Sequence, residues 1–157
     1  MNLVALTMAA VTLMGAPGDK PGGAVSMRVV AVQALNLNTG QKTPQFGPGL
    51  EEIRAAVKNL KFDTYRKVKA TTVTAPYNKE SRLPIDATYC LYVTPLSKES
   101  GGRIRFRERV TMAPRDRRGK PINALTTTLV AVPAKKLTLG GLKLDKGELV
   151  LVLSARG

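Results

Sequence analysis

Residues 102–110 read GRIRFRERV and alternate between basic and largely apolar side chains. The basic positions are Arg103, Arg105, Arg107 and Arg109, and the positions opposite them are Ile104, Phe106, Glu108 and Val110. A period of two is typical of a β-strand, because successive side chains point to opposite faces of the sheet. We therefore predict a strand whose arginines face solvent and whose other face, apart from Glu108, enters the core.

The same alternation recurs along most of the chain after residue 62. Strand-like runs after that residue fall at 65–73, 85–93, 122–132, 137–144 and 148–155, and an earlier one falls at 27–35. Gly140 and Gly141 predict a tight hairpin inside 137–144, and the last run, apolar on both faces, predicts a central strand. The sum is a mainly β fold, a β-sandwich or open barrel of about seven mostly antiparallel strands.

One segment has a helical period instead. Residues 48–60 place Leu50, Ile53, Val57 and Leu60 at helical spacing. Acidic residues begin this stretch and lysines end it, which complements the helix dipole. We expect one amphipathic helix that packs on one side of the sheets or closes an end.

The N-terminus is apolar. Residues 1–16, MNLVALTMAAVTLMGA, predict a signal peptide, although the sequence does not define its cleavage site. A Gly/Pro linker at 17–26 and a single β-rich domain at 27–157 are predicted to follow. The apolar run is too short to cross a bilayer as a helix, so we expect no transmembrane segment. The predicted location is the periplasm, the cell surface or the medium. The alternatives are a cytoplasmic protein that starts near Met27, or an N-terminal strand.

Composition narrows the chemistry. The chain of 157 residues carries a net charge of +14, which favours anionic partners. Histidine is absent, which removes the commonest general base and zinc ligand. The single cysteine, Cys90, is interpreted as structural, because no histidine is present to activate it. We expect no enzymatic activity, no cofactor and no metal.

The candidate anion-binding residues lie on the arginine-rich strand, in the connection after it and in the 65–73 strand. They are Arg103, Arg105, Arg107, Arg109, Arg115, Arg117, Arg118, Lys120, Lys67 and Lys69. Lys67 and Lys69 extend the row of arginines only if their strand pairs directly with the arginine-rich strand. The competing interpretation is a solvated face whose charges discourage pairing between strand edges. Tyr77 and Tyr92 are the candidate aromatic stackers, although no pattern links them to the arginines.

Three functions follow from these observations. The leading hypothesis is an exported, non-enzymatic structural or interaction protein of a bacterial cell envelope or extracellular assembly. Its basic strand face would bind a protein, an anionic envelope polymer or a lipid surface. Self-assembly of the protein is a further alternative. The alternative is a cytoplasmic nucleic-acid-binding β-domain that starts near Met27. The third is an enzyme that uses Cys90 or a pair of carboxylates.

Overall fold

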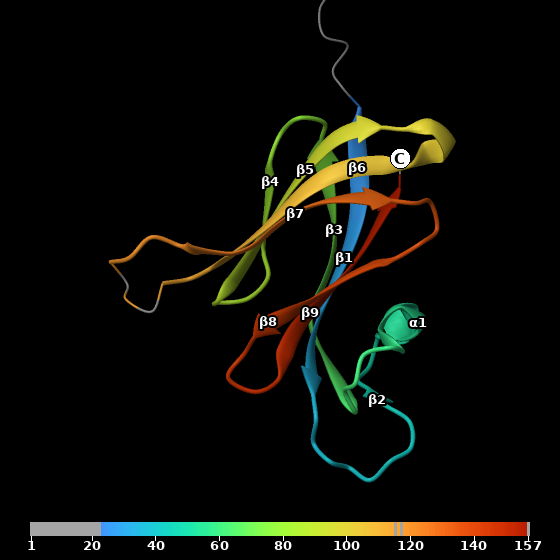
Figure 1. Ribbon diagram of the computed structural model, residues 1–157, viewed down its shortest axis with the longest axis vertical. Helices are drawn as coiled ribbons and strands as arrows, with labels where there is room; N and C mark the ends of the chain where they lie inside the picture. The colour runs from blue at the N-terminus through green and yellow to red at the C-terminus, as the bar shows by residue number, and fades with distance from the viewer. Residues whose placement is uncertain (1–22, 115, 117, 157) are drawn as a thin grey trace, which may run out of the picture.

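The computed structural model describes residues 23–114, 116 and 118–156 (Figure 1). The strands are β1 (Ala24–Leu35), β2 (Gln45–Phe46), β3 (Thr64–Pro76), β4 (Ser81–Pro84), β5 (Tyr89–Lys98), β6 (Ile104–Met112), β7 (Ile122–Ala131), β8 (Leu137–Lys143) and β9 (Glu148–Arg156). The helical elements are the 3-10 turns η1 (Glu51–Ile53) and η2 (Ser100–Gly102) and the helix α1 (Arg54–Val57).

These strands form two sheets, which confirms the predicted mainly β fold. Sheet A has the order β2-β3-β1-β9-β8, in which only the β2–β3 pair is parallel. Sheet B is antiparallel throughout and has the order β4-β5-β6-β7. Neither sheet closes into a barrel. The arginine-rich segment is β6, an inner strand of sheet B, between β5 and β7.

The main core lies between the two sheets. Leu91, Phe106 and Val110 of sheet B are fully buried against Leu149, Leu151 and other apolar residues of sheet A. This core is mostly aliphatic because the chain has no tryptophan and few aromatic residues. As predicted, β9 is an inner strand, flanked by β1 and β8 and apolar on both faces.

The short helix covers the outer face of sheet A. Leu50, Ile53 and Val57 are fully buried there and pack with Val150 and Val152 of β9. This second cluster explains why β9 is apolar on both faces. The predicted helical face is therefore correct, but the predicted extent of 48–60 was too long. Helical structure covers only η1 and α1, because Gly49 precedes it with φ +76° and the chain turns after Val57.

Two predicted strands differ from the observed ones. The alternation predicts one strand over 85–93, but β5 begins at Tyr89 because Asp86 forms a turn. Its Oδ1 atom accepts hydrogen bonds from the amides of Thr88 (2.8 Å) and Tyr89 (2.6 Å). An acidic side chain that bonds to its own following backbone stabilises a turn in place of a strand.

The predicted hairpin at Gly140 and Gly141 is also absent. The segment 137–143 is one strand, β8, which pairs with β9 along its length and has a bulge at the two glycines. Gly141 adopts φ +84°, which suits a bulge as well as a turn. The tight connection falls later, at Gly147 between β8 and β9.

At the N-terminus, strand β1 starts at Ala24, so residues 24–26 belong to the sheet and not to a linker. Val25 is fully buried in the core and pairs with Ala75 of β3. The predicted signal peptide at 1–16 lies outside the described residues. None of the helices in residues 23–156 that the structure describes is long and apolar enough to cross a membrane.

Candidate anion-binding face

Four arginines form a row, with Arg103 immediately before β6 and Arg105, Arg107 and Arg109 within it, and we refer to these four as the arginine row. The residues between them are buried, whereas the first three arginines are exposed and Arg109 is half-buried. The outward orientation predicted from the alternation is therefore correct. Residues two apart on a strand are separated by about 6.5 to 7 Å. The row thus presents guanidinium groups at regular intervals on the outer face of sheet B.

Two carboxylates neutralise part of this charge. Arg105 forms an ion pair with Glu99 at 2.7 Å, and Arg103 approaches the same carboxylate at 3.8 Å. Arg109 donates to Glu80 from Nη2 at 2.7 Å and from Nε at 3.4 Å, which raises the pKa of Arg109. Exposed pairs of this kind contribute about 0–1 kcal/mol, so competing anions can displace them.

Arg107 differs from its neighbours in the row. No carboxylate in the described part of the chain forms an ion pair with it. Its cross-strand neighbours are Thr94 on β5 and Thr128 on β7, which are both small and uncharged. The middle of the face therefore holds an accessible guanidinium between two hydroxyl-bearing side chains.

Sheet pairing adds two residues that sequence patterns did not connect to the row. Tyr92 lies opposite Arg109, whose guanidinium carbon sits 4.0 Å from the ring centroid. Arg82 of β4 lies opposite Tyr92, and the nearby Tyr92 side chain raises the pKa of Arg82. Arg82 thus adds a fifth guanidinium to this face. No sequence signal indicated this, because the pairing of β4, β5 and β6 is set by tertiary structure.

The two lysines of the candidate set lie elsewhere. Lys67 and Lys69 belong to β3 in sheet A, so the condition for extending the row is not met. Lys69 instead donates to the carbonyl of Pro84, the last residue of β4, at 2.6 Å. It reaches the end of β4 from sheet A and does not join the arginine face.

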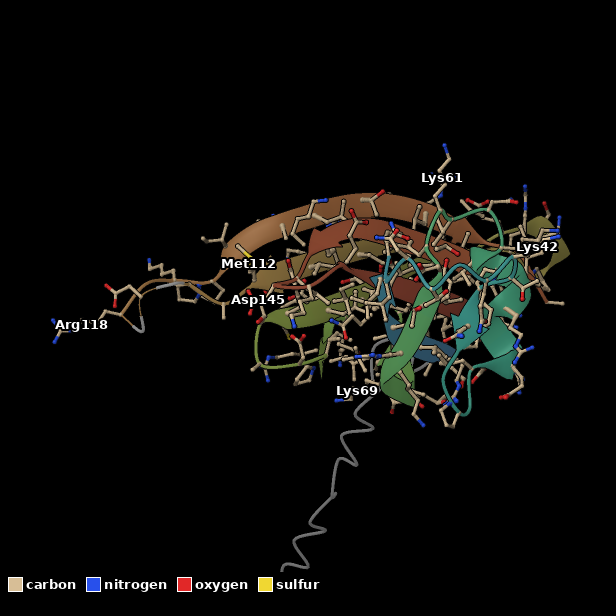
Figure 2. All side chains as sticks on the ribbon, turned by 90° about the horizontal axis from the view of Figure 1, so that it is seen from below. Lys42, Lys61, Lys69, Met112, Arg118 and Asp145 are labelled. Atoms are coloured by element: carbon tan, nitrogen blue, oxygen red, sulfur yellow. The ribbon has the colours of Figure 1, made fainter. Side chains whose placement is uncertain are left out.

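The basic connection between β6 and β7 extends away from the body of the molecule (Figure 1). Arg118 and Lys120 are exposed there, and Figure 2 shows Arg118 far from the two sheets. The amide of Arg118 bonds to the Asp116 carboxylate at 3.2 Å, which organises a turn. Arg115 and Arg117 lie outside the described residues. Arg118 and Lys120 therefore come after Arg109 in the chain, on the connection that leaves that end of β6.

Glu108 occupies the opposite face of β6 and is fully buried. Neither carboxylate oxygen has a hydrogen-bond partner among the described residues. Burial raises the pKa of Glu108 to about 8, so the carboxyl is mainly protonated at neutral pH. The alternation along β6 places Glu108 on the core side of sheet B and the adjacent Arg107 and Arg109 on its outer face. Its charge therefore does not offset the arginine face.

Cys90 is half-buried on β5, and its thiol lies 4.0 Å from the carbonyl oxygen of Leu91. Within the described residues, no three Cys, Asp or Glu side chains are grouped as a metal site would require.

A second basic group lies on the outer face of sheet A. A hollow of about 490 Å³ is lined by Arg28, Lys136 and Arg156 together with Glu52 and several hydroxyls. Arg28 binds Glu52 at 2.8 Å, which lowers the pKa of Glu52. Sequence patterns did not indicate this group, because its members come from distant segments.

Comparison with models of known protein families found no match to this chain. Searches of curated proteins and of solved structures found no match either. Functional inference therefore depends on the geometry of the molecule itself.

Proposed function

We propose that the protein is a non-enzymatic interaction module that binds an anionic partner through the outer face of sheet B. The observation that supports this most directly is the arginine row. Within the described residues, Arg107 forms no ion pair with a carboxylate, and Arg82 widens the basic surface. Guanidinium groups bind carboxylate, phosphate and sulfate by planar bidentate hydrogen bonds. The repeat along β6 suits a partner that bears anionic groups at regular spacing.

We further propose that this partner belongs to a cell envelope or an extracellular assembly. Support comes from the apolar segment 1–16, which has the composition of an export signal. The absence of histidine from the sequence favours binding over catalysis.

A cytoplasmic nucleic-acid-binding role has less support. Binding of single strands uses exposed aromatic rings on which bases stack. Arg109 already lies against the Tyr92 ring, and Phe106 is buried in the core. A chain that starts at Met27 would also lack Val25, which the core buries completely.

A binding assay with matched variants tests this function. The probes are heparin and poly-glutamate, and the quadruple variant R103Q/R105Q/R107Q/R109Q is compared with K42Q/K58Q/K61Q/K146Q, which removes the same charge from other elements. We expect the arginine variant to weaken binding far more than the lysine variant. Equal losses would mean that net charge alone attracts the probes, and the proposed face would be wrong.

A further inference from the structure

The edges of the two sheets differ in how they are protected. In sheet A, β2 pairs with only the first two residues of β3. The rest of the β3 edge carries Arg66, Lys67 and Lys69 and ends at Pro76. At the other edge of sheet A, β8 is interrupted by its bulge. In sheet B, β4 is four residues long and ends at Pro84, whose carbonyl accepts a hydrogen bond from the Lys69 ammonium group. Short strands, bulges, proline and lysine are the usual means by which proteins prevent edge pairing.

Strand β7 lacks these features over most of its length. It spans ten residues, INALTTTLVA, without a charge or a proline. One bulge occurs near its start, and residues 125–131 then pair regularly with β6. Alternate residues of an edge strand point their N–H and C=O groups away from the sheet, where an added strand can bind them. In the described part of the chain, β7 is therefore the edge best suited to accept another strand.

The side chains of β7 also fit an added strand. On the inner face, Leu125 and Leu129 are half-buried and pack against the rim of the core. Apolar side chains of a neighbouring strand would cover them. On the outer face, Thr126 and Thr128 are short and exposed, so they leave the space above β7 open toward Arg107 and Arg109.

Charge selects the kind of strand. An added strand would lie about 10 Å from β6, two strand spacings away, and long guanidinium and carboxylate side chains can span this separation together. The protein itself carries a net charge of +14, so a second copy is repelled and an acidic segment is attracted.

We propose that β7 binds an extended acidic partner segment as the fifth strand of sheet B. Its inward side chains are apolar and cover Leu125 and Leu129, whereas its outward side chains are carboxylates that reach the arginine row. This inference rests on the proposed function and specifies its partner as a protein segment with alternating apolar and acidic residues.

The test uses a short peptide that alternates valine and glutamate, labelled for fluorescence anisotropy and titrated with the intact protein. Two further peptides carry backbone N-methyl groups, one at the valines and the other at the glutamates. Because a strand bound at an edge uses only one set of its amides, we expect one methylated peptide to lose at least about tenfold in affinity and the other to bind like the parent. A scrambled peptide of the same composition is the control for charge alone.

A variant of the protein provides a second measurement. Leu125→Lys places a charge at the inner rim of β7, and we expect it to abolish peptide binding while heparin binding stays unchanged. If this variant does not fold, the methylated peptides still decide the question.

Each other outcome has a defined meaning. Equal binding of both methylated peptides, together with weakening by the arginine variant, would overturn the edge proposal and leave the proposed function standing. Self-association of the protein through β7 in place of peptide binding would also overturn it. If the protein binds neither the peptide nor heparin, both the proposed function and this inference are refuted.

Discussion

Glu108 leads to a specific prediction about stability and pH. Its carboxyl has a pKa of about 8 in the folded protein, because it is buried without a partner, and an ordinary value of 4.5 when the chain unfolds. Between these values the unfolded chain has released the proton that the folded protein retains. The unfolded state then binds fewer protons, so the free energy of unfolding decreases as pH rises. This contribution to stability is complete below about pH 4.5 and is lost up to about pH 8.

The magnitude follows from the separation of the two pKa values. They differ by ~3.5 units, and each unit corresponds to about 1.4 kcal/mol, so the full loss is about 5 kcal/mol. At pH 7 the loss is about 3 kcal/mol, a large share of the stability of a typical domain. The chain has no histidine, the side chain that ordinarily titrates in this interval, so the effect of Glu108 is well isolated.

The assay is urea unfolding from pH 5 to pH 8 for the wild type, E108Q and E108M. Glutamine keeps the shape of the side chain but cannot ionise, so the slope of unfolding free energy against pH should disappear. Methionine should also raise stability at pH 7, by up to about 3 kcal/mol, because it removes the buried polar group. The exposed Glu51→Gln is the matched control and should keep the wild-type slope. A wild-type profile that is flat across this interval would refute the reasoning.

Two further predictions concern the backbone and the N-terminal strand. Gly147→Ala should destabilise the fold by about 2 kcal/mol or more, because Gly147 has φ +74° and its new Cβ would collide with the Ala34 carbonyl. Gly141 has a similar φ but open space around it, so Gly141→Ala should lower the melting temperature less in the same thermal melt. A chain that starts at Met27 should lose at least the burial of Val25, about 1.5–3 kcal/mol, relative to one that starts at Gly23. Equal melting temperatures for these two chains would show that residues 24–26 are not part of the folded sheet.

Local patterns predicted the features that depend on local geometry. The alternation in β6 placed the arginines outside and Glu108 inside, and the apolar spacing of Leu50, Ile53 and Val57 identified the buried face of the helix. Each of these depends only on the period of one element. The Asp86 turn could also have been predicted, because an aspartate two residues after a proline is a common turn residue.

The remaining features depend on contacts between distant segments. Lys69 and Arg107 have similar sequence environments, yet one strand lies in sheet A and the other in sheet B. Tyr92 joins the arginine face only through the pairing of β5 with β6. Gly140 and Gly141 permit both a hairpin and a bulge, and the bulge allows residues on both sides of the glycines to pair with β9.

The central claim is that the outer face of sheet B binds anions through the arginine row. The most direct measurement is the dependence of heparin affinity on salt concentration for three proteins: the wild type, the quadruple arginine-to-glutamine variant, and E80Q/E99Q. The last variant releases Arg103, Arg105 and Arg109 from their carboxylates without adding a positive residue. Each arginine that contacts the polymer contributes about one unit to the slope of log affinity against log salt. We therefore predict the steepest slope for E80Q/E99Q, an intermediate slope for the wild type and the shallowest for the arginine variant. Identical slopes for all three would contradict the account.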